Sequence, residues 1–422
     1  MVKRERVKIA FVHPDLGIGG AERLVLDIAG ALKKQNYEIV FVTNHFEKLH
    51  AFDELKNDEF HVEVYGDWLP RAIFGRFQAF CAYIRMIYLA LVYITFGERQ
   101  SKPDLYFVDL IPTAIPFLKL TKKKVIYYCH HPDLLASPPG GILKKIYRKP
   151  IDWIEGRATA MSDVILVNSE YTGSVFRKTF PDIVKPIQIL YPTIAHSYQE
   201  EVRKASSKKH ITDIVPEINS KSKDLIIFLS LNRFHPAKRL EFAIDGMERL
   251  RDITTSDEWS KIFCIIAGGY DPQSRINKTY FNDLVALVNQ KCLGDKIIFM
   301  KSPSDKVKVD LLKTISALLY TPLNEHFGIV PLEAMLTAKP VIAMNSGGPR
   351  ETVDHGITGY LCEPTAESVA QFMLQIVRAN PMEMGVQGRQ QLEDKFSYNK
   401  FCSNLHKIVK EVTKKKNKIS TN

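Results

Sequence analysis

The second half of the chain carries the stretch that bears most directly on its fold, Asn324-Glu325-His326-Phe327-Gly328-Ile329-Val330-Pro331-Leu332-Glu333-Ala334-Met335. Two carboxylates, Glu325 and Glu333, stand on either side of a loop glycine. Pro331 suits the first turn of a helix, because the N–H that it lacks would have no partner there. We therefore expect a helix with Glu333 in its first turn and Glu325 in the preceding loop. Backbone N–H groups of residues 327–330 would lie between the acids and could bind phosphate oxygens. The stretch thus suits a nucleotide-sugar, which has hydroxyls on both sides of a diphosphate.

Both halves of the chain alternate short apolar runs with helical patterns. In the first half we predict a helix at 21–35 and strands at 7–12, 38–43, 105–109, 125–129, 164–167 and 188–190. In the second half we predict helices from 240 and at 280–291, and strands at 225–231, 262–267, 296–299, 317–320 and 340–344. Strands separated by helices indicate a parallel sheet covered on both faces. The sequence therefore predicts an α/β protein with two doubly wound, Rossmann-like domains that face each other across a ligand-binding cleft.

The composition turns polar over residues 196–223, which is typical of a linker or an exposed excursion. We therefore assign residues 1–195 to the first domain and 224–400 to the second, nucleotide-sugar-binding domain. Residues 401–422 would form a C-terminal helix and a basic tail.

Further groups in the second half follow predicted strands. Arg233 and Lys238 could both bind a diphosphate, Arg through its planar fork and Lys as a point charge. Gly268 and Gly269 form a glycine turn after the next strand, and residues 345–351 contain another. A single glycine turn is usually architectural. Several of them at successive strand ends, with a basic pair and an acidic pair, indicate a ligand site.

The first half offers a glycine turn and two histidines at strand ends. Gly19 and Gly20 precede the first helix, where glycine lets the backbone approach a ligand, although the turn lacks the GxGxxG spacing. His130 and His131 follow the strand at 125–129, where a histidine can bind a sugar hydroxyl.

The sequence shows no zinc spacing and no Asp-x-Asp pair in a metal-binding context. We therefore expect no metal cofactor, with basic side chains and helix N–H groups meeting the charge of a leaving diphosphate.

The net charge of +11 favours anionic partners. Basic clusters lie at 122–124, 144–149 and 410–418, and each is as compatible with a solvated face as with membrane contact. No aromatic-interleaved RNA-binding strand accompanies them, which argues against nucleic acid. The six cysteines form no CxxC pair, which is typical of buried thiols in a reducing compartment.

Residues 77–96 carry a single charge, Arg85, and are long enough to span a bilayer. A charge near the middle of a span would cost roughly 2.5–3.5 kcal/mol. Helical spacing places Gln78 and Arg85 opposite an apolar face made of Phe77, Phe80, Cys81, Ile84, Ile87, Tyr88 and Leu91. We expect a helix that packs on its domain and dips into the membrane interface. A true span and an internal core helix are the alternatives.

These residues resemble those of the retaining glycosyltransferases of family 4, which share the two-domain glycosyltransferase-B fold. The family's spacing of Glu, seven residues and Glu is met by Glu325 and Glu333. The resemblance implies that Glu333 binds the nucleotide ribose and that Glu325 lies beside the donor sugar. It further implies that the basic pair binds the diphosphate. The candidate catalytic residues are Glu325, His130 and Lys238, and the candidate donor-binding residues are Gly19, Gly20, Arg233, Lys238, Gly268, Gly269, His326, Phe327, Gly328, Ile329 and Glu333.

Within family 4 the chain resembles the dolichol-pathway mannosyltransferases, on the stretches 13–25, 150–155, 267–271 and 345–349. His131 and Arg239 depart from the usual pattern. This resemblance implies retaining transfer of mannose from GDP-mannose to a dolichol-linked oligosaccharide, Man-GlcNAc2-diphosphate-dolichol, through an α-1,3 and then an α-1,6 bond. The reaction would take place on the cytosolic face of the endoplasmic reticulum membrane, with other dolichol-pathway mannosyltransferases as candidate partners. The alternatives are a family-4 enzyme with another lipid-linked or soluble acceptor, and a non-catalytic nucleotide-binding protein.

Overall fold

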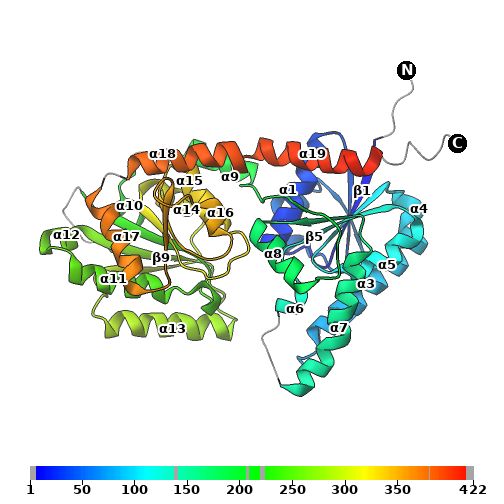
Figure 1. The fold of residues 1–422 in the computed structure, drawn as a ribbon, viewed down its shortest axis with the longest axis horizontal. Helices are drawn as coiled ribbons and strands as arrows, with labels where there is room; N and C mark the ends of the chain where they lie inside the picture. The colour runs from blue at the N-terminus through cyan, green and yellow to red at the C-terminus, as the bar shows by residue number, and fades with distance from the viewer. Residues whose placement is uncertain (1–5, 137–140, 206–208, 219–223, 380, 415–422) are drawn as a thin grey trace. The chain divides into compact units, whose positions relative to one another are not determined.

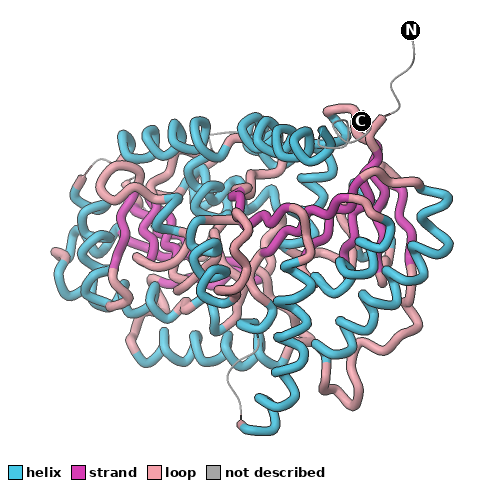
Figure 2. The backbone as a smooth tube through the Cα atoms, turned by 45° about the vertical axis from the view of Figure 1, so that its right-hand side comes forward, coloured by secondary structure: helices cyan, strands magenta, loops and turns pink. Residues whose placement is uncertain are grey.

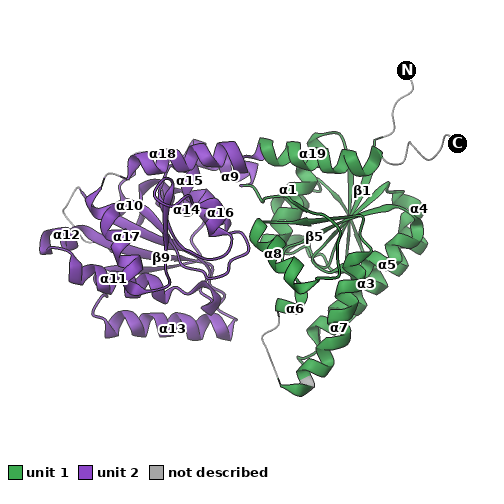
Figure 3. Cartoon of the chain, viewed as in Figure 1, with its two compact units in different colours: residues 1–193, 399–422 green, residues 194–398 purple. Residues whose placement is uncertain are grey.

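The structure is a computed structural model that describes residues 6–136, 141–205, 209–218, 224–379 and 381–414. The chain forms two compact units, residues 1–193 with 399–422 (unit 1) and residues 194–398 (unit 2), shown in Figures 1 and 3. Each unit contains one parallel β-sheet covered by helices (Figure 2). The prediction of two doubly wound α/β domains is therefore confirmed.

The sheet of unit 1 has the strand order β3-β2-β1-β4-β5-β6-β7. Its strands are β1 (Lys8–His13), β2 (Glu38–Thr43), β3 (His61–Val64), β4 (Leu105–Asp109), β5 (Lys124–Cys129), β6 (Val164–Val167) and β7 (Ile187–Ile189). The order reverses at β1, and a doubly wound sheet binds its ligands at the carboxyl ends of the strands around such a switch point. The sequence did not predict β3, because this short edge strand is only partly buried and shows no apolar run.

Helices cover both faces of this sheet. They are α1 (Gly20–Lys34), α2 (Asp53–Lys56), α3 (Gln78–Val92), α4 (Glu98–Ser101), α5 (Ile115–Leu118), α6 (Asp133–Ala136), α7 (Ile142–Ala160), α8 (Glu170–Thr179) and α19 (Tyr398–Lys414). One face packs residues of β1, β2, β4, β5 and β6 against α3, α5 and α8 in a single apolar cluster. Figure 1 shows α1 on the other side of the sheet from α3 and α5.

Helix α3 runs through a π-helical turn (Tyr93–Gly97) into α4, and residues 78–101 are long and apolar enough to cross a membrane. The sequence did not predict which face of this helix packs on the domain, and the structure shows that Arg85 faces the domain. The guanidinium is buried and donates to the carbonyl oxygens of Leu69 (3.1 Å) and Asn44 (3.3 Å). Met86 and Leu89 pack in the core beside it. Four side chains of the apolar face are left exposed: Phe77, Phe80, Ile84 and Leu91.

The sheet of unit 2 has the strand order β10-β9-β8-β11-β12-β13. Its strands are β8 (Ile226–Leu231), β9 (Ile262–Gly268), β10 (Ile297–Lys301), β11 (Ala317–Tyr320), β12 (Val341–Met344) and β13 (Gly359–Cys362). The main helices are α11 (Glu241–Ile253), α13 (Arg275–Gln290), α14 (Asp305–Thr314), α15 (Ile329–Leu336), α17 (Ala366–Arg378) and α18 (Met382–Gln391), with the shorter α12 (Ser256–Lys261) and α16 (Pro349–Thr352). Residues of α11, α13 and α17 pack on one face of the sheet. The short edge strand β13 was not predicted.

The predicted linker at 196–223 differs from the structure. It contains α9 (His196–Lys204) and α10 (Ile211–Ile214), which belong to unit 2. Val202 and Ile211 are buried, and Lys209 pairs with Asp310 of α14 at 2.5 Å. The sequence did not predict these two helices, because their few apolar residues are widely spaced in a polar segment.

The C-terminal helix returns to unit 1. Gln35 donates through Nε2 to the carbonyl oxygen of Cys402 (3.0 Å), and the ring of Tyr37 lies edge-on to that of His406. The domain boundaries of 224–400 and 401–422 are thus corrected to 194–398 for unit 2, with α19 part of unit 1. The tail from residue 415, predicted to be basic, lies outside the described residues.

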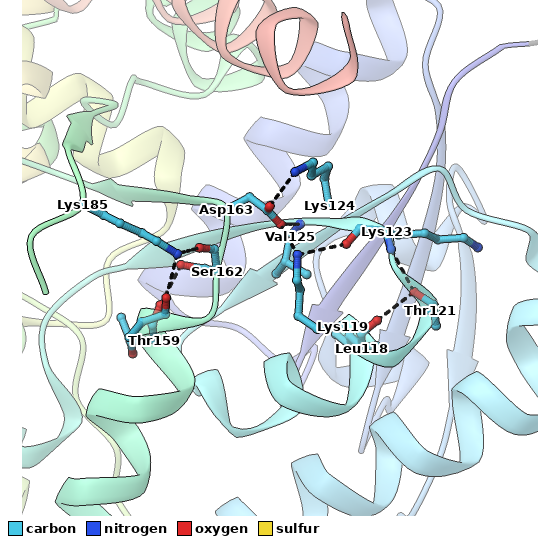
Figure 4. A network of polar contacts seen from close by, with 11 residues as sticks. Leu118, Lys119, Thr121, Lys123, Lys124, Val125, Thr159, Ser162, Asp163 and Lys185 are labelled. Carbon is cyan, nitrogen blue, oxygen red and sulfur yellow. Dashed lines mark hydrogen bonds and ion pairs between the residues drawn. The ribbon is translucent and has the colours of Figure 1, made fainter. Parts of the chain in front are cut away.

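Asp163, which precedes β6, links the amino ends of β5 and β6 in unit 1 (Figure 4). Its carboxylate accepts from Lys119 Nζ (2.7 Å), Lys124 Nζ (2.9 Å) and the backbone N–H of Val125 (2.8 Å). These bonds join β5 to β6 at the edge opposite the carboxyl ends. This edge therefore serves stability, and the carboxyl edge is left for ligands.

The orientation of α3 predicts different effects for two leucines in the same helix. Leu89 is fully buried, so Leu89→Ala should lower the free energy of unfolding by about 2–5 kcal/mol. Leu91 is 41% exposed, so Leu91→Ala should cost at most about 1 kcal/mol. Urea unfolding of both variants measures the difference. Equal losses would contradict the orientation.

Candidate functional site

The candidate donor residues of unit 2 lie on loops at the carboxyl ends of neighbouring strands. Arg233 and Lys238 follow β8, Gly268 and Gly269 end and follow β9, Glu325 follows β11, and Gly347 and Gly348 follow β12. The strands β9, β8, β11 and β12 are consecutive in the sheet. Parallel strands end at the same edge, so the topology gathers these loops at one edge of unit 2.

The loop after β11 leads into α15 earlier than predicted. Gly328 is the N-cap with φ +84°, and the helix begins at Ile329. Pro331 is therefore the third helical residue and Glu333 the fifth, so the prediction that Glu333 lies in the first turn is wrong. The left-handed conformation at Gly328 starts the helix before the proline is reached. The N–H groups of Ile329 and Val330 remain at the free end of the helix, beside Gly328.

Two glycines after β12 allow their loop to pack directly on the loop after β11. A Cβ on Gly347, which has φ +68°, would lie 2.4 Å from the carbonyl oxygen of Glu325. A Cβ on Gly348 would lie 2.4 Å from the Cα of Phe327. The N–H of Gly348 donates to the carbonyl oxygen of Glu325 (2.7 Å). Backbone contact thus helps to fix the segment that carries Glu325, together with the Ser346 hydroxyl, which accepts from the N–H of Asn324 (2.9 Å).

The carboxylate of Glu325 accepts a hydrogen bond from Lys238 Nζ, and both side chains are partly exposed. The Lys238 loop is held in place by Thr321, whose hydroxyl donates to the carbonyl oxygen of Lys238 (2.7 Å). Burial and the nearby Glu325 carboxylate raise the pKa of Tyr320 well above its usual range. Tyr320 therefore stays protonated under Gly328, where a Cβ would lie 3.0 Å from its ring. The structure brings together the predicted Lys238 and Glu325.

Arg233 lies on the glycine turn after β9. A Cβ on Gly269 would lie 3.3 Å from Arg233 Cγ, and a Cβ on Gly268 would lie 1.9 Å from the carbonyl oxygen of Asn232. The turn is hydrogen-bonded to the same loop, because Phe234 N–H donates to the carbonyl oxygen of Gly269 (2.9 Å). Arg233 remains exposed. Because neither glycine has a side chain, the loop after β8 that carries Arg233 and Lys238 can pack directly on this turn.

Glu333 differs electrostatically from Glu325. Burial raises the pKa of the Glu333 carboxyl to about 7, with Lys308 opposing the rise and Asp305 adding to it. The same carboxylate contributes, after burial, to the raised pKa of Tyr198 in α9. Near neutral pH Glu333 can thus take or release a proton when a polar ligand arrives, which suits a group that binds hydroxyls.

In unit 1 the carboxyl ends of β1, β4 and β5 carry a buried charge cluster. Asp109 Oδ2 lies 3.0 Å from His13 Nδ1, and Asp109 Oδ1 lies 2.9 Å from His130 Nε2. Glu22 of α1 lies 3.8 Å from His13 Nε2. His13 and Asp109 are buried, whereas His130 is partly exposed. Asp109 therefore fixes the orientation of the predicted His130.

Burial alone would lower the pKa of His13, but the Asp109 and Glu22 carboxylates outweigh it and raise the pKa to about 9. The pKa of Asp109 falls well below its usual range, because His130 and His13 outweigh burial. The carboxylate of Glu22 lies over Gly19, the N-cap of α1, where a Cβ would meet it at 2.2 Å. Gly19 and Gly20 thus open the helix beneath a negative side chain, where an incoming anion would meet Glu22 as well as the helix start.

Sequence reasoning missed His13, Asp109 and Glu22 as site residues. A signal for Asp109 was present, since an acid ends a fully buried strand at the carboxyl edge. His131, the other predicted histidine, has its Nδ1 3.0 Å from the carbonyl oxygen of Pro132. Among the described residues no group of three or more His, Cys, Asp or Glu side chains could hold a metal ion.

The His13 ring should titrate near pH 9, above its ordinary value of 6.5, so its protonation stabilises the fold fully below pH 6.5 and progressively less up to pH 9. NMR titration of the imidazole measures this. Asp109→Asn should move the titration downward, because burial then dominates. A wild-type titration near 6.5 would contradict the arrangement.

Comparison with known proteins places the chain among glycosyltransferases. Residues 212–391 match the family described as glycosyl transferases group 1, and residues 18–197 match the one described as glycosyltransferase family 4. Together the two matches cover most of both units.

Relatives extend the similarity over the whole chain. The human protein named alpha-1,3/1,6-mannosyltransferase ALG2 is 41% identical over 409 residues, which are 95% of each chain. The protein of that name from Dictyostelium discoideum is 39% identical over 424 residues, 98% of this chain and 100% of the relative. The solved sucrose-phosphate synthase from Thermosynechococcus elongatus shares the fold, with a TM-score of 0.74 at 16% identity over 97% of this chain and 100% of its own.

Proposed function

We propose that this chain, which belongs to the ALG2 family of alpha-1,3/1,6-mannosyltransferases, uses GDP-mannose as its donor and a lipid-linked Man-GlcNAc2-diphosphate as its acceptor. The chain is a glycosyltransferase, and its family membership makes the transferred sugar mannose. An α-1,3 bond would form first and an α-1,6 bond second. Nothing favours the alternative of another acceptor.

The observation that carries the donor assignment is the set of loops around Glu325 in unit 2. Lys238 is hydrogen-bonded to Glu325, and Arg233 is exposed on the same loop as Lys238. Two cations with the free N–H groups at the start of α15 suit a diphosphate. We assign the ribose to Glu333 and the donor sugar to Glu325.

We propose a front-face, retaining reaction. The bond between mannose C1 and the phosphate oxygen breaks, and the acceptor hydroxyl forms its bond to C1 on the same face. The leaving phosphate takes the proton of that hydroxyl. Arg233, Lys238 and the backbone N–H groups stabilise the charge that develops on the diphosphate, so the proposal requires no metal ion. A trapped covalent mannosyl-enzyme would overturn it.

We further propose that unit 1 rests on the cytosolic face of the endoplasmic reticulum membrane through the exposed side of α3. Arg85 is turned inward, while Phe77, Phe80, Ile84 and Leu91 face outward at helical spacing. A helix that buries its charge and exposes its aromatic side chains fits a lipid interface rather than water. Packing of Met86 and Leu89 in the core supports a helix lying on the membrane rather than crossing it.

The central test is a transfer assay with purified protein, GDP-mannose and the lipid-linked trisaccharide in detergent or vesicles, followed by linkage analysis. We expect an α-1,3 product and then an α-1,6 product. Transfer only to a phosphoinositol or polysaccharide acceptor would support the alternative, and no mannose transfer to any of them would refute the proposal.

Glu325→Ala should abolish both transfers, with a fall in kcat of at least about 10²-fold, because one donor site serves both bonds. Glu383→Ala removes an exposed acid of unit 2 and serves as the control. The rates of the α-1,3 and the α-1,6 transfer are measured separately, each with the acceptor of that step. Loss of only one bond would require a second donor site.

Membrane attachment should depend on the exposed side of α3. Phe80→Glu with Ile84→Glu should shift the protein from the floating to the soluble fraction in vesicle flotation, because two charges would enter the lipid interface. Val184→Glu changes an apolar residue of unit 1 that is 91% exposed and lies outside α3, and this variant should float like the wild type. Flotation of the double variant would contradict this attachment surface.

A further inference from the structure

A cavity of about 570 Å³ lies within unit 1, between the start of α3 and the first half of α7. Lys144, Tyr147 and Arg148 line it from one face of α7, and Arg76 lines it from the loop before α3. Among the described residues Asp133 is the one acid in the lining, and its carboxylate accepts from Arg148 Nη2 (3.2 Å) and the Tyr83 hydroxyl (3.3 Å). Arg148 is paired with carboxylates, and Arg76 and Lys144 add two further positive charges to the lining, which makes the cavity suitable for an anion.

Arg148 has a hydrogen-bonding group that the protein does not satisfy. The residue is 8% exposed, and its Nη2 also pairs with Asp152 at 2.8 Å. Its Nε–H is buried without an acceptor among the described residues. A buried donor that lacks an acceptor is costly. Arg148 lines the cavity, but a ligand oxygen would reach this N–H only after a shift of the side chain, because Nε has almost no accessible surface.

The start of α3 adds further donors. Its N-cap, Phe77, makes no side-chain hydrogen bond to the helix. Gln78 and Ala79, the first two helical residues, line the cavity. N–H groups at this position have no intrahelical acceptor and lie at the positive end of the helix dipole. They can bind the same anion as Arg148.

The rim of the cavity is apolar and strained. Ile73 and Arg76 pair as a two-residue hairpin, with Phe74 (φ +49°) and Gly75 (φ +68°) at its tip. Phe77 also has a positive φ, +59°. Bulky residues rarely adopt this conformation, and strained positions of this kind cluster at functional sites. Here it leaves the ring of Phe74 97% exposed beside the cavity.

The chemistry of the cavity and that of its rim point to one kind of ligand. Ile142 and Ile146 of α7 are exposed one helical turn apart, near the basic lining. A free phosphate has no apolar part that could contact the exposed aromatic and aliphatic side chains. A phosphate group attached to a hydrocarbon matches both features.

We propose that this cavity binds the diphosphate of a polyprenyl-diphosphate-linked acceptor, with the hydrocarbon leaving over Phe74 and Phe77 toward the bilayer. The proposal rests on the lipid-linked acceptor of the proposed function and assigns its binding site. Asp133 lies three residues beyond His130, so the segment that borders the cavity also carries the strand-end histidine. Anchoring the diphosphate here would present the glycan to the carboxyl edge of the unit 1 sheet.

The test measures binding of the full chain to nanodiscs that contain polyprenyl diphosphate, polyprenyl monophosphate or phosphatidylglycerol, with GDP present to occupy the donor site. The wild type should bind the diphosphate discs at least about tenfold more tightly than the other two. Arg76→Ala with Lys144→Ala should lose this preference and raise KM for the lipid-linked acceptor at least about tenfold, since the loss of even one hydrogen bond to a charged group costs about a factor of ten.

Lys145→Ala is the matched control, because it removes the same charge one residue away on α7, outside the cavity lining. It should keep both the preference and the KM. Equal wild-type binding to all three discs, or an equal loss in Lys145→Ala, would overturn the cavity as a diphosphate site and indicate general surface charge. A preference for diphosphate without any mannose transfer would instead refute the proposed function and leave the cavity assignment standing.

Discussion

The close backbone approach of residues 347–348 to residues 325–327 is the contact on which the unit 2 site depends. A Cβ at either glycine would come within 2.4 Å of the neighbouring backbone. The absence of side chains lets Gly348 N–H donate to the Glu325 carbonyl oxygen at 2.7 Å. Glu325 is thereby held where Lys238 can reach its carboxylate. The position of the carboxylate is a consequence of the loop contact and does not require a rigid side chain.

In unit 1 the candidate site residue is positioned by charged side chains, whereas in unit 2 it is positioned by close backbone packing at two glycines. Asp109 lies between His13 and His130 at the ends of three neighbouring strands. Its ionised carboxylate, kept charged by these partners, holds a buried protonated His13 and orients a partly exposed His130. A buried ion cluster is costly unless its members satisfy one another. The cluster therefore ties the orientation of one candidate catalytic group to the integrity of the sheet edge.

The features that could be predicted from the sequence are those that depend on apolar periodicity and on the positions of strand ends. The central strands, the two-domain organisation and the placement of Lys238 and Glu325 on loops at the carboxyl edge of one sheet follow from apolar runs and from the rule for parallel sheets. The orientation of α3 could not be predicted, because helical spacing offers two faces and only tertiary partners choose between them. Here the carbonyl oxygens of Asn44 and Leu69 bind Arg85 and turn the charge inward. Similarly, the start of α15 depended on the positive φ of Gly328, which overrode the helix-start signal of Pro331.

The two units divide the task by chemistry. In the proposed reaction, cations and helix N–H groups of unit 2 would bind the nucleotide diphosphate, and a histidine, an outward apolar helix face and a basic cavity of unit 1 would serve the lipid-linked acceptor. The most direct test of the donor assignment is amide hydrogen exchange with and without saturating GDP. Protection at residues 233–238, 324–330 and 345–349 is the predicted result. Unchanged exchange in those loops, or protection confined to unit 1, would contradict it.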